Sequence, residues 1–188
     1  MTEQMKLNRL DVAGADERRD EVVGAYVEVY ADTGDEFFGE DRFRRQIASH
    51  MTAPSWEMVT ADLGTSGKGL IGFVYGFALP AATGWWRGLL TDVPAGFTDE
   101  DGRRTVAISE ILVRASWRRQ GLGRRLHDTF LAGRSEGRAT LLVEPDNAPA
   151  QAAYAAWGWR KVAQLRPGWE GAPLYDVLIR PLDRDRYG

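Results

Sequence analysis

The stretch Arg118-Arg119-Gln120-Gly121-Leu122-Gly123 joins two segments whose residue patterns differ. The run Val106–Val113 before it is typical of a strand, and the run Gly123–Ser135 after it is typical of an amphipathic helix. Glycines let backbone N–H groups turn toward a ligand without interference from a Cβ atom. A helix that begins there adds unpaired N–H groups and a partial positive charge. The stretch therefore predicts an anion-binding loop, with a phosphate as the expected ligand.

The charge distribution supports an anionic ligand. The chain has a formal net charge of −3, yet seven arginines between Arg114 and Arg138 face only Asp128 and Glu136. Most charge runs are solvated surfaces, but these arginines flank the glycine-rich stretch. A nucleic-acid partner is not expected, because the whole chain is acidic and few aromatic residues accompany the arginines.

Composition limits the class of protein. At 188 residues, with 44% hydrophobic and 27% charged residues, the chain is expected to form a single globular domain over residues 1–188. It has no apolar run long enough to span a membrane and no signal-peptide pattern at its start, so a cytoplasmic location is expected. Because it has no cysteine, and His50 and His127 are its only histidines, no metal site is expected.

The pattern of apolar residues and turn residues predicts an alternation of strands and helices. Strands are expected at Lys6–Val12, Trp56–Leu63, Leu70–Leu79, Thr105–Val113, Thr140–Val143, Trp159–Leu165 and Leu174–Leu182. Helices are expected at Glu17–Tyr30, at Asp41–Met51, at Gly123–Ser135, and in a run capped by Asp146 or Asn147 that Gly158 ends. Gly64–Gly69 is expected to be a turn, and Gly72 and Gly76 are expected to permit a bulge or the close approach of another backbone. This order predicts a mixed α/β sheet.

The segment Pro80–Arg104 fits neither pattern. It contains Trp85-Trp86, Pro94 and the acidic run Asp99-Glu100-Asp101. Long loops in compact domains are usually functional or disordered, and the paired tryptophans argue against disorder. We expect a long, ordered excursion between two strands.

Two motifs together resemble the GCN5-related N-acetyltransferase (GNAT) superfamily. The family's phosphate motif is Gln or Arg, two residues, Gly, one residue, then Gly or Ala, and the stretch 118–123 matches every constrained position. A second motif begins 24 residues further on, where Asn147, Ala150, Tyr154, Gly158 and Trp159 resemble the family's Asn–Ala–Tyr–Gly–Phe spacing. Trp159 departs mildly from the usual Phe or Tyr.

The resemblance implies a fold, a reaction and a set of binding residues. The implied fold is an α/β (α+β) GNAT fold, with a central mixed, mostly antiparallel sheet of about seven strands flanked by helices. The implied reaction moves an acetyl group from acetyl-CoA directly to a small amine or a peptide amine, without a metal, and members of the family are often homodimers. The implied coenzyme A contacts are Ile111, Leu112, Val113, Arg118, Arg119, Gln120, Gly121, Leu122, Gly123, Arg124, Asn147 and Tyr154.

Two side chains, Tyr154 and Glu110, are candidates for proton transfer. Tyr154 is the candidate general acid, because a tyrosine with an unperturbed pKa of about 10 can protonate a leaving thiolate whose pKa is ~8.5. The alternative is that it only packs its helix on the sheet. Glu110, on an apolar strand face, is the candidate general base, because burial raises the pKa of a carboxyl group. The alternative for Glu110 is a structural ion pair, and Glu144 is the reserve base. Asn147 is expected to contact the cofactor, to cap its helix, or both.

The acceptor side and the rival functions stay open at this point. Phe37, Phe38, Trp85 and Trp86 line an acceptor pocket in one interpretation and belong to the core in another. Likewise, Asp92, Asp99, Glu100 and Asp101 either attract a cationic amine or form a solvated loop. A nucleotide-binding P-loop at Gly64–Gly69 lacks its first glycine and its Ser or Thr, and a dinucleotide-binding motif lacks its third glycine. The remaining rival is a non-catalytic acyl-CoA sensor.

Overall fold

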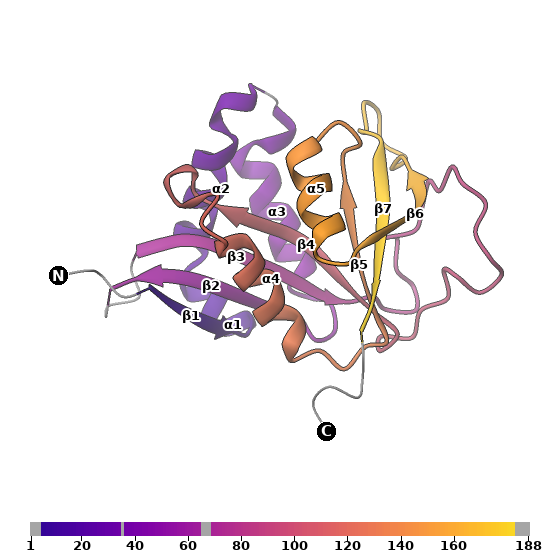
Figure 1. Ribbon diagram of the computed structural model, residues 1–188, viewed down its shortest axis with the longest axis horizontal. Helices are drawn as coiled ribbons and strands as arrows, with labels where there is room; N and C mark the ends of the chain where they lie inside the picture. The colour runs from indigo at the N-terminus through magenta and orange to yellow at the C-terminus, as the bar shows by residue number, and fades with distance from the viewer. Residues whose placement is uncertain (1–4, 35, 65–68, 183–188) are drawn as a thin grey trace. The chain divides into compact units, whose positions relative to one another are not determined.

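The computed structural model describes residues 5–34, 36–64 and 69–182 of the chain. Within these ranges, seven strands form one mixed sheet in the order β1-β2-β3-β4-β5-β7-β6, with helices flanking it (Figure 1). The β4–β5 pair is parallel, and the pairs β1–β2, β2–β3, β5–β7 and β6–β7 are antiparallel. The predicted fold class is thereby confirmed. Contacts along the chain divide it into two compact units, residues 1–77 with 109–134 and residues 78–108 with 135–188.

The first unit contains most of the helices. Its helices and strands are β1 (Met5–Leu10), α1 (Val12–Glu17), α2 (Arg19–Tyr30), α3 (Glu40–His50), β2 (Glu57–Leu63), β3 (Gly69–Ala78, of which Ala78 is assigned to the second unit) and α4 (Leu122–Ala132). It also contains the 3₁₀ turns η1 (Ala31–Thr33), η2 (Glu36–Phe38) and η3 (Ala115–Trp117). Strand β4 (Thr105–Val113) contributes residues to both units. The second unit contains β5 (Arg138–Val143), α5 (Ala148–Ala156), β6 (Arg160–Leu165) and β7 (Tyr175–Pro181).

In the first unit, helices α3 and α4 cover opposite faces of β3. Gly72 of β3 faces Leu126 of α4, whereas Tyr75 contacts His50 of α3. These two strand positions are an odd number of residues apart, so they point to opposite faces. Figure 1 shows α4 in front of the strands of this unit.

The expected helix Glu17–Tyr30 is wrong in its first turn. Arg18 interrupts it, and a separate helix, α1, precedes that residue. Helix α1 begins after Asp11, whose side chain accepts a hydrogen bond from the Gly14 N–H at 2.9 Å. At the break, the Arg18 guanidinium donates to Asp62 Oδ1 at 2.6 Å, and the side chain of Asp62 is only 1% exposed. The spacing of apolar residues predicted the helix, but such spacing carries no information about this cap or this ion pair.

Most other predicted elements agree with the structure to within two residues. The first strand ends at Leu10, because Asp11 caps the next helix, and β5 begins at Arg138, two residues before the expected start. Helix α4 stops at Ala132, with the exposed Gly133 as its C-cap, so the expected end at Ser135 is too late. The core of the expected turn Gly64–Gly69 lies outside the described residues. No helix within the described ranges is both long enough and apolar enough to cross a membrane.

Replacing Gly72 with alanine is expected to destabilise the protein by about 1–3 kcal/mol, as overpacking does in well-packed interiors. A Cβ atom there would lie 2.7 Å from the carbonyl oxygen of Leu112 on β4, so the backbone of β3 or β4 would have to move. Urea unfolding measures the change. The matched control is Gly24→Ala in α2, where a Cβ atom meets nothing within 4 Å and helix propensity favours alanine. A Gly72→Ala protein as stable as the wild type would contradict the expected clash.

In the second unit, the long excursion is ordered, as predicted. Its residue Leu89 forms a bridge with Leu165 of β6, and Leu90 N–H donates to Gln164 O at 2.9 Å. The backbone of Gly88 has φ +84°, and a Cβ atom there would lie 1.9 Å from the carbonyl oxygen of Arg166. Glycine is therefore required where the excursion meets the edge of β6.

Glu100 fixes the excursion to the sheet. Its side chain is 0% exposed, and its Oε1 atom accepts hydrogen bonds from Trp86 Nε1 at 3.1 Å, Thr105 Oγ1 at 2.8 Å and Arg138 Nη2 at 3.1 Å. The Arg138 guanidinium also lies over the ring of Phe97, 4.6 Å from its centroid. Both expectations for Glu100 are therefore wrong, because it neither attracts an amine from solvent nor belongs to a solvated loop.

Candidate functional site

The glycine-rich stretch forms the turn that leads into α4. Arg119 and Gly121 both have positive φ angles, +59° and +76°, and Gly121 is the N-cap of α4. No side chain in the described chain caps this helix, so its first N–H groups are not satisfied in that way. Side chains support the turn from behind, since Arg118 Nε donates to Val113 O at 3.0 Å and Gln120 Nε2 donates to Ser116 O at 3.1 Å. Such a helix start is suited to bind an anion.

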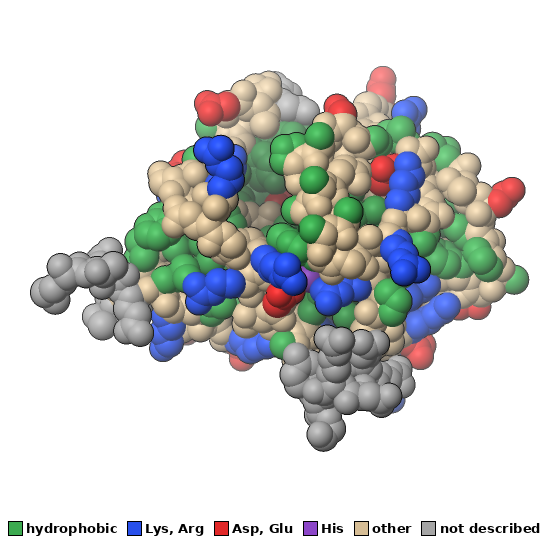
Figure 2. All heavy atoms as spheres, viewed as in Figure 1, with side chains coloured by type: hydrophobic (Ala, Val, Ile, Leu, Met, Phe, Trp, Pro, Cys, Tyr) green, Lys and Arg blue, Asp and Glu red, His purple; other side chains and the backbone are tan. Residues whose placement is uncertain are grey.

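Basic side chains surround this turn. Arg118, Arg119, Arg124 and Arg125 are all exposed. Within residues 5–34, 36–64 and 69–182, Arg124 alone of these four pairs with an acid, Asp128, at 3.3 Å. Figure 2 shows several basic side chains on the face of the molecule that carries α4 in Figure 1. The positive potential of these residues adds to that of the helix start.

Strand β4 is connected to the turn through η3. Its parallel ladder with β5 pairs Thr105–Ala107 with Arg138–Thr140, and the predicted pantetheine-binding residues Ile111, Leu112 and Val113 come after the last of these pairs. On the β3 side, β4 approaches closely at Gly72, as the sequence predicted. Arg114, just beyond β4, donates from its N–H to Ile71 O at 2.9 Å and forms an ion pair with Glu28.

Glu110 is a partly buried carboxylic acid on β4. The hydroxyl of Tyr30, at the end of α2, donates to Glu110 Oε1 at 3.0 Å. Burial raises the pKa of Glu110 to about 7, while the hydrogen bonds from Tyr30 and from the Ile111 backbone act in the opposite direction. This direction is the one that the strand pattern predicted. In the described chain, Glu110 forms no ion pair with an arginine, so the structural alternative for it is not supported.

A polar cluster beside Glu110 was not predicted. Ser109 Oγ, Tyr75 Oη and His50 Nδ1 lie 3.1–3.2 Å from one another, and Gln46 Nε2 donates to Tyr75 Oη at 3.4 Å. Burial and the charge of Arg42 lower the pKa of His50 to about 4, so its ring is neutral near pH 7. The i, i+4 spacing of residues 42, 46 and 50 on α3 was the sequence signal that could have revealed this cluster.

Helix α5 carries the two remaining predicted residues in the second unit. Asn147 is its N-cap, and its side chain accepts from Ala150 N–H at 3.2 Å, so the helix-cap interpretation is confirmed. Tyr154 is 9% exposed and packs edge-on against Trp157 and Trp159, with ring centroids 5.6 Å and 6.1 Å apart. Packing and catalysis are compatible roles for Tyr154, because a buried ring still carries a hydroxyl group.

Asp176 of β7 anchors α5 to the sheet. Its carboxylate accepts from Gln151 Nε2 of α5 at 3.1 Å and from Gln164 Nε2 of β6 at 2.9 Å, and it pairs with Lys161 at 2.7 Å. Gln151 also donates to the backbone carbonyl of Glu144, the reserve base, at 3.3 Å. Because Gln151 lies one helical turn before Tyr154, these contacts fix the tyrosine's helix in place.

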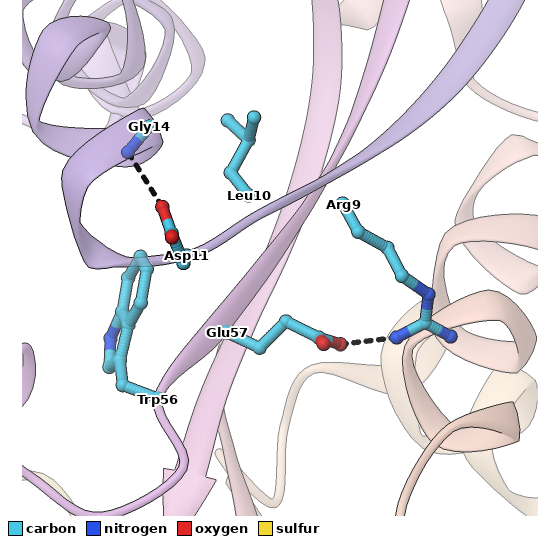
Figure 3. Close-up of a pocket in the computed structure, with 6 residues that line it drawn as sticks. All are labelled: Arg9, Leu10, Asp11, Gly14, Trp56 and Glu57. Atoms are coloured by element: carbon cyan, nitrogen blue, oxygen red, sulfur yellow. Dashed lines mark hydrogen bonds and ion pairs between the residues drawn. The ribbon is translucent and has the colours of Figure 1, made fainter.

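Other predicted positions have structural roles. Trp86 is buried beside Glu100 in the second unit, which supports the core interpretation, whereas Phe37 and Phe38 lie in the first unit next to Tyr30 and Arg42. Figure 3 shows an open depression in the first unit, lined by Arg9, Leu10, Asp11, Gly14, Trp56 and Glu57. None of the predicted site residues lines it, and its Arg9–Glu57 pair and Asp11 cap are internal contacts.

Comparisons with known proteins agree with this geometry. The family model described as acetyltransferase (GNAT) family matches residues 25–159. An acetyltransferase from Thermus thermophilus is 20% identical, with 97% of this chain and 100% of that chain covered at a TM-score of 0.61. The ribosomal-protein-S18-alanine N-acetyltransferase from Escherichia coli is 15% identical, with coverage of 96% and 95% at a TM-score of 0.62. PaiA N-acetyltransferase from Thermoplasma acidophilum, in complex with coenzyme A, is 11% identical, with coverage of 95% and 99% at a TM-score of 0.56. No curated protein sequence matches the chain significantly.

Proposed function

Because the chain belongs to the acetyltransferase (GNAT) family, we propose that it is an acetyl-CoA-dependent N-acetyltransferase. The amine nitrogen of the acceptor attacks the thioester carbonyl carbon, the carbon–sulfur bond breaks, and coenzyme A leaves as the thiol. The complete absence of cysteine favours direct transfer in a ternary complex over an acyl intermediate on a cysteine of the enzyme.

The observation that carries this proposal is the uncapped start of α4 with its two positive-φ residues, Arg119 and Gly121. The backbone N–H groups of residues 119–124 would hold the pyrophosphate of coenzyme A, and Arg118 and Arg124 would add positive charge. Ile111, Leu112 and Val113 would offer backbone groups to the pantetheine arm, as the family resemblance implies.

Two residues are assigned to proton transfer. Glu110 would accept the proton of the attacking amine through a water molecule, because its pKa of about 7 matches proton acceptance near neutral pH. Tyr154 would protonate the departing thiolate, because an unperturbed tyrosine with a pKa of about 10 is protonated at neutral pH. Asn147 would contact the cofactor in addition to capping α5.

Calorimetric titration with acetyl-CoA tests the phosphate site. We expect micromolar binding to the wild type and a loss of at least about tenfold in affinity for Gly121→Glu, because a carboxylate would enter an anion site. Gly121→Ala is the matched control. A Cβ atom there meets nothing within 4 Å, so this variant carries the backbone cost of a positive φ without the negative charge.

The outcomes separate the candidate functions. Absence of binding to the wild type would contradict the proposed cofactor. Equal losses for the two variants would show that backbone strain, and not charge, explains the effect. Binding without transfer to any amine would instead identify a non-catalytic acyl-CoA sensor.

A further inference from the structure

Arg42 is a cation held in place by contacts with Phe37 and Gln46. Its guanidinium stacks on the ring of Phe37, 3.4 Å from the centroid, and its Nη1 donates to Phe37 O and to Gln46 Oε1, each at 3.2 Å. It forms no ion pair with any residue that the structure describes, whereas Arg44 on the same helix pairs with both Glu40 and Asp20. Arg42 is partly buried and held in one orientation, so it is prepared to bind an anion with little loss of entropy.

Among the side chains that the structure describes, none within hydrogen-bonding reach of Arg42 carries a neutralising charge. Gln46 links it to the cluster of Tyr75, Ser109 and His50. His50 is neutral, because its pKa is lowered to about 4, and burial raises the pKa of Tyr75 well above its usual value, so it is neutral too. The charge of Arg42 lowers the pKa of both groups, although burial outweighs this effect at Tyr75.

A group of the opposite charge, Glu110, is adjacent in sequence to Ser109 of the same cluster. Glu110 follows Ser109 in β4 and accepts a hydrogen bond from Tyr30, and its charge raises the pKa of Tyr75 whereas that of Arg42 lowers it. All of these residues belong to the first unit. A neutral polar cluster thus adjoins both a cation, Arg42, and a carboxyl group, Glu110. This arrangement is complementary to a molecule that carries both an amine and a carboxylate.

We propose that Arg42 binds a carboxylate of the acceptor, so that the acceptor belongs to the amino-acid class. This inference rests on the proposed function, in which Glu110 accepts the amine proton. A carboxylate matches the planar guanidinium fork and can accept two parallel hydrogen bonds from it. A polyamine would place a cation against Arg42, and a peptide N-terminus would offer it only a neutral amide.

Matched acceptor triplets test the proposal, each consisting of an amino acid, its amide and its decarboxylated amine. One example is phenylalanine, phenylalaninamide and phenethylamine, and ω-amino acids with their amides extend the panel to other spacings. Thiol release from acetyl-CoA gives kcat and KM. We expect the best acceptors to be carboxylates, with KM raised about 10- to 100-fold by Arg42→Gln and partly restored by Arg42→Lys. The KM of the amides should be the same in Arg42→Gln as in the wild type.

Arg45→Gln is the matched control, because Arg45 is exposed on the same helix, and it should leave every KM unchanged. Circular dichroism melting checks that the variants are folded. Transfer without preference for carboxylates, or an equal rise in KM for acids and amides, would overturn the role of Arg42 while leaving acetyl transfer intact.

A panel without any transfer, despite acetyl-CoA binding, would contradict the proposed function instead. Ligand-detected NMR with the same triplets and the coenzyme A-loaded protein then decides the present inference. Amino-acid binding that Arg42→Gln abolishes would support it, and binding that is absent or unchanged in that variant would overturn it.

Discussion

The Tyr154→Phe variant is expected to lose about 100- to 10,000-fold in kcat, the range that a positioned general acid contributes, with acetyl-CoA affinity nearly unchanged. Phenylalanine keeps the ring that packs against Trp157 and Trp159 and removes only the hydroxyl group. Transfer then has to expel an unprotonated thiolate. Steady-state kinetics with the best amine and calorimetry with acetyl-CoA measure the two quantities separately.

The position of α5 should survive this substitution. The helix is held by its Asn147 cap and by the contact of Gln151 with Asp176. Tyr175→Phe, at the start of β7, is the matched control and should retain full activity. Wild-type turnover in Tyr154→Phe would end the proposed role of Tyr154. A parallel loss of acetyl-CoA affinity would show that the residue binds the cofactor rather than protonating the product.

The parts of the fold that the sequence predicted well are those with strong periodicity or a constrained backbone. The strand and helix on either side of residues 118–123 appear as β4 and α4, and Gly72 allows the close approach that was expected of it. The break at Arg18 was missed, because it depends on Asp62, 44 residues away in the sequence. Glu100 was misread for the same reason, since its partner Arg138 is 38 residues distant.

In the candidate site, too, the features that depend on local sequence were predicted and those that depend on distant residues were missed. Local motifs predicted the turn at residues 118–123 and the Asn147 cap, both of which the structure contains, and they made Tyr154 a candidate acid. The strand pattern was enough to expect a raised pKa for Glu110, because a carboxyl group among apolar neighbours is desolvated. The cluster of His50, Tyr75 and Ser109 comes from α3, β3 and β4, and each of these residues has an ordinary local context. Only the folded chain shows that they touch one another.

That cluster also bears on how Glu110 can work as a base. A carboxyl group next to an arginine would have a low pKa and would be a weak base. Here the nearest hydrogen-bonding groups are neutral, and Arg42 is engaged with Phe37 and Gln46. The pKa of Glu110 therefore stays near 7, and its charge remains available to a protonated amine. The separation of Arg42 from Glu110 is what permits one residue to bind an anion and the other to accept a proton.

The Glu110→Gln variant is expected to lose about 100- to 10,000-fold in kcat/KM and to lose the acidic limb of the pH profile. In the wild type, Glu110 must be deprotonated to accept a proton. With its pKa at about 7, kcat/KM should rise about tenfold per pH unit below pH 7 and level off above it. Glutamine cannot titrate, so any pH dependence left in the variant belongs to the amine. Rates between pH 5.5 and 9, with an acceptor of known pKa, measure the limb.

The free energy of unfolding should fall as pH rises, whereas kcat/KM rises over the same range. The pKa of Glu110 is raised in the folded state, from 4.5 to about 7, so the native protein binds this proton more tightly than the unfolded chain. The stability that this proton provides is complete below pH ~4.5 and is lost as pH rises through about 7, a change of at most about 3 kcal/mol. Glu110→Gln should abolish this contribution, and urea unfolding at pH 5 and pH 8 measures it.

Two further variants make the assignment specific. Glu170→Gln changes an exposed carboxyl group and should alter neither the rate nor its pH profile. Glu144→Gln removes the reserve base. If Glu110→Gln keeps full activity and its acidic limb while Glu144→Gln loses both, the base is Glu144, and the pKa of Glu110 reflects only its burial. If Glu110→Gln loses the limb but keeps its rate above pH 8, Glu110 controls the charge of the bound amine without itself taking the proton.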